Sequence, residues 1–173
     1  MGVWESECPG SCLRAESIVK FGIVGLASPD MHRFGESPKD RDVEIACVWD
    51  YEHSQADAFR RRFGGAIVDD IELVADEGLD GVIISVRKGD QARYAIPFIA
   101  GGVLALIYDP VGMTQHDVDR VIEAVDEHRT PIMFAREVGD FPSVLQTFLE
   151  LCDTGEIVAH PDETVEVVYP GGS

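Results

Sequence analysis

Residues 18–30 read IVKFGIVGLASPD, and this stretch decides the fold class. A short run of apolar and β-branched residues ends at Gly25 and passes directly into a turn, as the first strand of a parallel α/β sheet does. Five more runs of this kind follow, with longer segments of helical period between them, at residues 43–49, 66–68, 81–86, 103–108 and 131–135. The alternation predicts a three-layer α/β sandwich around a mostly parallel, six-stranded, doubly wound sheet.

Capping signals place two helices between these strands. Thr114 and Asp117 form a capping box ahead of a helix over residues 114–129. Ser54 and Asp57 repeat that arrangement ahead of an earlier helix.

Two further helices are predicted from period and punctuation. The first covers residues 90–100 and contains Pro97, which lacks a backbone N–H and should kink or shorten it. The second covers residues 141–152 and stops before Gly155, a residue suited to the left-handed conformation that ends helices.

The chain therefore divides into one domain with two short ends. Residues 1–17 are predicted to be a loose N-terminal arm, residues 18–158 the α/β domain, and residues 159–173 a short C-terminal tail with a strand-like stretch at 164–169.

Composition narrows the function classes. The chain has 173 residues and a formal net charge of -18, with 14 basic residues of which only 3 are lysine. Because so acidic a surface repels phosphate backbones and anionic lipids, neither nucleic-acid nor membrane binding is expected.

Scattered acidic residues with little lysine resemble the proteins of salt-loving archaea and predict salt-dependent folding; the alternative is an ordinary acidic protein. No apolar run is long enough to span a bilayer, and no signal peptide precedes the domain, which predicts a cytoplasmic location.

Motifs for metal binding and nucleophilic catalysis are absent. Cys8 and Cys12 lack two further ligands at suitable spacing, so we expect unused thiols. The five histidines are well separated and form no ligand pair. Neither a phosphate-binding P-loop nor a serine elbow occurs. We therefore predict no metal site and no catalytic residue.

The turn after the first strand reads Gly25-Leu26-Ala27-Ser28-Pro29-Asp30. A dinucleotide fingerprint has glycine at the first, third and sixth of these positions, for a tight turn, close approach to pyrophosphate and helix packing. Only the first position matches. Ala27 still permits a fairly close approach, whereas Asp30 places an anion where phosphates would lie. The segment is either a degenerate phosphate-binding turn or simply a strand-to-helix connection.

An acidic residue ends the second predicted strand. Asp50 lies 25 residues after Gly25, where a carboxylate can accept hydrogen bonds from both hydroxyls of an adenosine ribose and repel a 2′-phosphate. That interpretation favours NAD over NADP. A turn or helix-capping role for Asp50 explains the residue equally well.

With these residues in place, residues 20–158 resemble the nucleotide-binding domain of the glucose-fructose oxidoreductase and inositol dehydrogenase family (Gfo/Idh/MocA). The resemblance rests on the order and spacing of FGIVGLA (21–27), VEIACVWDYEHSQADAFRRRFGG (43–65), DGVIIS (80–85), AGGVLALIYDPVGMT (100–114) and FPSVLQTFLELCDTGEIV (141–158). It implies a Rossmann-like fold that binds NAD(P). The cofactor-binding residues that it implies are Gly25, Leu26, Ala27, Ser28, Asp50, Ser85, Val86 and Arg87.

The chain departs from that family at two loops. Where the family carries Glu-Lys-Pro, with a lysine that assists proton transfer, this chain reads Tyr108-Asp109-Pro110. After the fourth strand it has Ser85-Val86-Arg87-Lys88-Gly89-Asp90 in place of the family's Thr-Pro-Asn-x-x-His type of loop. Arg87 and Lys88 are either anion ligands or part of a solvated loop.

The family's second domain, which holds a sugar or polyol, is absent from these 173 residues. The resemblance therefore predicts an NAD-dependent oxidoreductase acting on a CH–OH group, catalytically incomplete alone and dependent on a partner chain. The alternative is a non-enzymatic interaction or regulatory module on a decayed Rossmann fold. The apolar residues of the 141–152 helix exceed what one buried face needs, which predicts that they meet the C-terminal tail, a second copy of the chain in a homo-oligomer, or a partner chain.

Overall fold

The computed structural model describes residues 18–36, 42–76, 78–137, 140–156 and 164–172. The arm at residues 1–17, with Cys8 and Cys12, lies outside the described residues.

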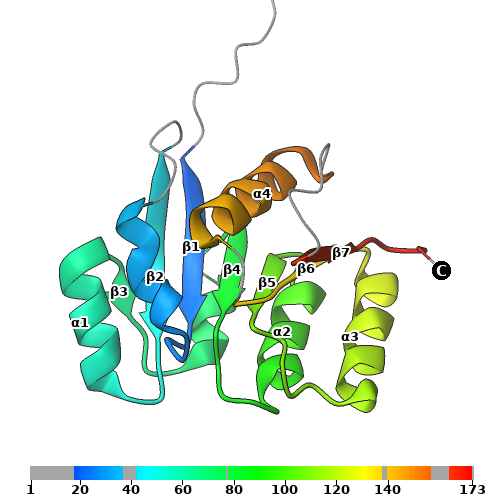
Figure 1. Cartoon of the computed structure of the whole chain (residues 1–173), viewed down its shortest axis with the longest axis horizontal. Helices are drawn as coiled ribbons and strands as arrows, with labels where there is room; N and C mark the ends of the chain where they lie inside the picture. Colours follow the sequence, from blue (N-terminus) through cyan, green and yellow to red (C-terminus); the bar gives the residue numbers. More distant parts are fainter. Residues whose placement is uncertain (1–17, 37–41, 77, 138–139, 157–163, 173) are drawn as a thin grey trace, which may run out of the picture.

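The described residues form a seven-stranded sheet in the order β3-β2-β1-β4-β5-β6-β7 (Figure 1). The first six strands pair in parallel and β7 pairs antiparallel to β6. The strands are β1 (Val19–Val24), β2 (Val43–Trp49), β3 (Ala66–Ile67), β4 (Gly81–Ile84), β5 (Leu104–Tyr108), β6 (Ile132–Ala135) and β7 (Val165–Val168).

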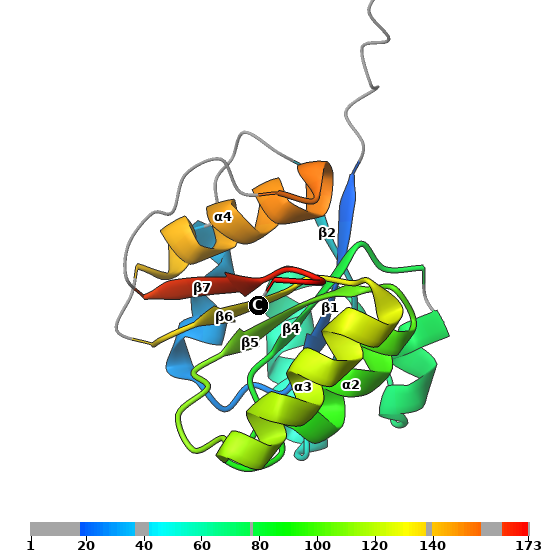
Figure 2. The ribbon, with the colours of Figure 1, turned by 90° about the vertical axis from the view of Figure 1, so that its right-hand side faces the viewer.

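Helical segments cover both faces of the sheet, as the three-layer prediction requires. One layer, with α4, packs on the core that contains Phe21, Phe59 and Phe148. The other, with α2 and α3, packs on the opposite face (Figure 2). The helical segments are η1 (Pro29–Glu36, a 3-10 helix), α1 (His53–Phe63), η2 (Ile71–Asp76, a 3-10 helix), α2 (Gln91–Ala100), α3 (Gln115–His128) and α4 (Phe141–Thr154).

The strand count differs from the prediction of six. The strand-like stretch in the predicted tail is β7, which pairs with β6 from Ile132↔Val168 to Ala135↔Val165. Its Val165 is buried in the same core as α4. Alternation in the sequence marks a strand but does not say which edge it pairs with, so the tail was not recognised as part of the sheet.

Two of the predicted helix-end signals are confirmed and one is wrong. The capping box at Thr114 and Asp117 is present, and Gly155 ends α4 with φ +73°. The predicted Ser54 and Asp57 box is wrong, because Glu52 is the N-cap residue of α1 and makes no side-chain capping bond. Asp57 instead pairs with Arg60 and Arg61 on its own helix.

Two features of the helices α2 and α4 bear on the predictions. Pro97 does not shorten α2, which continues to Ala100. The apolar residues of α4 are all buried within this chain, so the exposed surface that the partner prediction invoked is not there. They are Phe141, Val144, Leu145, Phe148, Leu149 and Leu151.

Two kinds of feature are absent from the described residues. No helix there has the length and apolar character needed to cross a bilayer. No group of three or more potential ligand side chains in the same ranges could hold a metal ion.

Candidate functional site

The strand order reverses at β1, which lies between β2 and β4. In a doubly wound sheet this reversal opens a crevice at the carboxyl ends of the strands, and ligands bind there. Three loops surround it here: residues 25–28 after β1, Asp50 after β2 and residues 85–87 after β4. Together these loops carry all eight residues that the sequence predicted as cofactor-binding.

Hydrogen bonds hold the three loops together. The Leu26 N–H donates to Asp50 Oδ2 at 2.8 Å, and the Ala27 N–H donates to the Ser85 carbonyl at 2.9 Å. The Ser28 N–H donates to Ser85 Oγ at 3.0 Å. The predicted residues therefore form one contiguous structure.

Gly25 is required by the geometry of the first turn. Its φ is +81°, and an added Cβ would lie 2.4 Å from the Ser85 carbonyl oxygen and 2.8 Å from Val86 Cγ1. A positive φ favours glycine, and a carbonyl oxygen at that distance leaves no room for a methyl group. The first glycine of the fingerprint thus serves the tight turn against β4.

Asp50 has the structural role that the sequence left open. Its Oδ2 accepts from Leu26 and its Oδ1 accepts from the Glu52 N–H, also at 2.8 Å. Each carboxylate oxygen has two lone pairs, so two acceptor positions remain. The turn role and the ribose role of Asp50 are therefore compatible.

Asp50 borders a hollow of about 340 Å³ at the carboxyl ends of β2 and β3. His53, with its Nδ1 3.8 Å from Asp69 Oδ1, is the one residue of this lining that can carry positive charge. The lining residues are Trp49, Asp50, Tyr51, His53, Ala56, Ile67, Val68 and Asp69.

A second hollow, of about 170 Å³, lies at the carboxyl ends of β4, β5 and β6. Arg87 and Lys88 bring positive charge to it, and Asp109 and Glu137 bring negative charge. Its lining residues are Ala27, Ser28, Ser85, Val86, Arg87, Lys88, Tyr108, Asp109 and Glu137.

Arg87 links the two hollows. It lines the second, and its guanidinium lies 4.2 Å from the centre of the Tyr51 ring, which lines the first. This is cation–π geometry. The Tyr51 hydroxyl donates to Asp90 at 2.6 Å, and burial, followed by this bond, raises the pKa of Tyr51. Tyr51 thus stays a neutral support for Arg87.

The end of β5 and the loop that follows it, residues 108–114, contain no cationic side chain. Tyr108 is buried, and its hydroxyl donates to Asp30 Oδ2 at 2.6 Å. Burial, then the Asp30 carboxylate, raises the Tyr108 pKa. Asp109 has a φ of +59°, which is uncommon for a residue with a side chain. Neither residue supplies the cationic assistance that a lysine would.

Tyr51, Asp90 and Glu137 were not among the predicted site residues. Glu137 follows β6 as Asp50 follows β2, so the same inspection of strand ends would have found it. Tyr51 follows β2 at the same offset, and Asp90 ends the loop after β4, so strand ends point to them too; their contacts with Arg87 and with each other are visible only in three dimensions.

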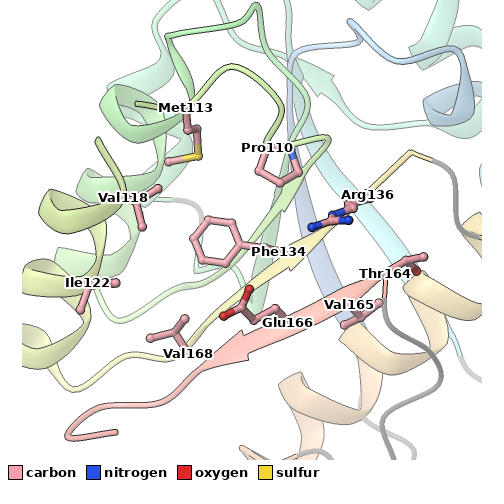
Figure 3. Close-up of a pocket in the computed structure, with 10 residues that line it drawn as sticks. All are labelled: Pro110, Met113, Val118, Ile122, Phe134, Arg136, Thr164, Val165, Glu166 and Val168. Carbon is pink, nitrogen blue, oxygen red and sulfur yellow. The ribbon is translucent and has the colours of Figure 1, made fainter. Parts of the chain in front are cut away.

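A third hollow, of about 240 Å³, lies between α3 and the β6–β7 pair (Figure 3). Its lining is mostly apolar, with Arg136 and Glu166 as its charged members. It contains none of the predicted site residues.

Several features of the crevice suit a nicotinamide dinucleotide. The first hollow offers a carboxylate to a ribose, Gly25 keeps the turn tight, and Arg87 lies between the two hollows. The backbone N–H groups of Ser28 and Asp30 donate to serine hydroxyls, which can rotate. The residues present therefore fit a nicotinamide dinucleotide. The N–H groups that face its phosphates in such a fit are hydrogen-bonded to the chain's own serine side chains.

These features define a dinucleotide-binding Rossmann domain. Residues 19–135 match the model of the oxidoreductase family Gfo/Idh/MocA, described as an NAD-binding Rossmann fold. The chain belongs to this family and is its NAD-binding Rossmann domain. This match does not favour the alternative of an interaction module on a decayed fold. No curated protein matches the chain.

Solved structures share the fold. An NAD-binding protein from Listeria innocua is 20% identical, with a TM-score of 0.58 over 70% of this chain and 35% of its own. A 3-ketoreductase from Actinomadura kijaniata, KijD10, in complex with NADP, is 17% identical, with a TM-score of 0.59 over 69% and 39%. A putative myo-inositol dehydrogenase from Sinorhizobium meliloti is 19% identical, with a TM-score of 0.58 over 67% and 35%. The chain spans little more than a third of the length of these proteins.

Proposed function

We propose that the chain binds NAD in preference to NADP, in the crevice formed by Gly25, Leu26, Ala27, Ser28, Asp50, Ser85, Val86 and Arg87. The first hollow carries this proposal. Asp50 and Asp69 place two carboxylates on its lining, and His53 lies beside Asp69. A 2′-phosphate would meet negative charge there, whereas two ribose hydroxyls would find acceptors on Asp50.

We further propose that the chain serves an oxidoreductase that acts on a CH–OH group of a sugar or polyol. NAD, when bound, supplies the hydride acceptor. The chain's own part is to bind and orient the cofactor through Asp50, Arg87 and the turn at Gly25. Because Asp109 stands in place of a lysine and Tyr108 is turned toward Asp30, proton transfer at the substrate depends on a group that these residues do not supply, and we propose a partner chain as its source.

The test is calorimetric titration of the chain with NAD and with NADP, for the natural sequence and for Asp50→Ala. We expect NAD to bind at least about tenfold more tightly than NADP, because a charge-assisted hydrogen bond contributes about 1.5–3 kcal/mol. Asp50→Ala should weaken NAD by roughly tenfold or more and narrow the difference between the two dinucleotides.

The control is Glu123→Ala, which removes an equal charge at an exposed position of α3 that lines none of the three hollows. It should leave both affinities within about twofold. A folded protein that binds neither dinucleotide would refute the proposed function. Equal NAD and NADP affinities would refute the role of Asp50 in selecting NAD.

A further inference from the structure

The backbone donors of the turn after β1 all have partners inside the chain. The donors held by rigid partners are Gly25 to the Trp49 carbonyl, Leu26 to Asp50, Ala27 to the Ser85 carbonyl and Met31 to the Ser28 carbonyl. The Ser28 and Asp30 N–H groups, in contrast, donate to the hydroxyls of Ser85 and Ser28, at 3.0 and 3.3 Å. Pro29 has no N–H. A phosphate can therefore gain backbone donors here only by displacing serine hydroxyls.

Glu137 binds one of these two hydroxyls, that of Ser28. The Ser28 hydroxyl accepts from the Asp30 N–H and donates its proton to Glu137 Oε1 at 2.9 Å. Ser28 and Ser85 are 5% and 2% exposed, whereas Glu137 is exposed. The carboxylate thus reaches in from the solvent side and binds the hydroxyl beside the turn.

The same carboxylate carries a charge that opposes a phosphate. Glu137 lines the second hollow with Arg87 and Lys88, the cations on the facing loop after β4. A pyrophosphate that reached the turn would be attracted by these two cations and repelled by Glu137. Asp30 accepts from the Tyr108 hydroxyl and is paired with Arg33 at 3.4 Å, so Glu137 is the carboxylate that opposes a phosphate most directly.

We propose that Glu137 competes with the phosphates of the dinucleotide for the turn at Ser28 and thereby sets the affinity for the cofactor. This inference rests on the proposed function. Glu137 is exposed, so it can swing away from Ser28 at small cost when the cofactor enters. The turn then offers the Ser28 hydroxyl, and rotation of that hydroxyl releases the Asp30 N–H.

The experiment compares Glu137→Gln with the natural chain by calorimetric titration with NAD, and by NMR titration with adenosine, which has no phosphate. Glutamine can still accept from the Ser28 hydroxyl, so this variant removes the charge and keeps the contact. We expect Glu137→Gln to bind NAD about tenfold more tightly, which corresponds to about 1.4 kcal/mol. Its adenosine affinity should be unchanged, and molar KCl should reduce the gain in NAD affinity.

Glu166→Gln on β7 is the matched control, because it makes the same charge change at an exposed position outside the crevice. It should shift NAD affinity by less than about twofold. An equal gain in both variants, an equal gain for adenosine, or weaker NAD binding by Glu137→Gln would each overturn the inference and leave the proposed function standing. Binding by Glu137→Gln alone would support the inference and refute NAD binding by the natural chain. NAD binding by neither Glu137→Gln nor the natural chain would overturn both the inference and the proposed function.

Discussion

At the scale of single residues, Gly25 has no room for a side chain. It combines a positive φ with a carbonyl oxygen in the place of any side chain. Gly102 offers a natural comparison, because it has a similar φ of +77° with nothing within 4 Å of an added Cβ. Substitutions at these two glycines separate the cost of backbone strain from the cost of the contact with Ser85 and Val86, which follow β4.

We expect Gly102→Ala to lower the free energy of unfolding by about 1–3 kcal/mol, the usual cost of a residue in a strained backbone region. Gly25→Ala should lower it by about 1–3 kcal/mol more, because Ser85 and Val86 must move. Urea unfolding of both variants measures the difference. Equal losses would show that the close approach to Ser85 relaxes freely.

Asp50 illustrates how two sequence interpretations can both describe one residue. Its contacts with Leu26 and Glu52 give it the turn role, and its place on the first hollow supports the ribose role. Position along the chain could not separate these roles, because both need a carboxylate at the end of β2.

At the scale of elements, the capping box of α3 is the most complete local signal. The Thr114 hydroxyl accepts from the Asp117 N–H and donates to Asp117 Oδ2, and that oxygen also accepts from the Thr114 N–H. Thr114→Ala should therefore lower the free energy of unfolding by about 1 kcal/mol. Thr114→Ser keeps the hydroxyl and should cost much less; equal losses by urea unfolding would contradict the capping role.

The capping box of Thr114 and Asp117 also predicts how the stability of the fold depends on pH. Hydrogen bonds from the Thr114 side chain and backbone hold the pKa of Asp117 below its ordinary value. Because the folded-state pKa is lower than the unfolded one, the stabilisation is present above the ordinary carboxyl pKa and is lost as pH falls through the folded value. In Thr114→Ala the Asp117 pKa, followed by NMR, should rise toward its ordinary value. An unchanged pKa would assign the shift to other groups.

The earlier helix shows why such signals fail. Ser54 and Asp57 have the spacing of a capping box, but α1 begins one residue before Ser54. That offset moves Ser54 from the N-cap position into the helix and takes Asp57 beyond the third helical position, where it lies beside Arg60 and Arg61. Sequence spacing identifies a box only when the start of the helix is known to the residue.

At the scale of the whole molecule, charge governs the conditions in which the fold is stable. A net charge of -18 on 173 residues repels itself in dilute buffer. Salt shortens the screening length from about 10 Å at 0.1 M to about 3 Å at 1 M, which weakens this repulsion.

We therefore expect the midpoint of thermal unfolding to rise by several degrees, on the order of 5 °C or more, as KCl increases from about 0.1 to 2 M. Sucrose of equal osmolality is the control, because it is uncharged and acts by exclusion from the surface. A midpoint that rises no more in KCl than in sucrose would contradict the electrostatic explanation and the expectation of a salt-adapted protein.

The sequence by itself determined most strands and helices of this protein and the strand ends at which we propose its site. Alternating runs and helical periods are local properties, so six parallel strands and the position of Asp50 followed from neighbouring residues. The tertiary structure alone decided that β7 completes the sheet, that α4 buries its apolar residues and that Glu137 meets Ser28 across 109 positions of the chain. Such contacts depend on which distant surfaces pack together, and local pattern carries no information about that choice.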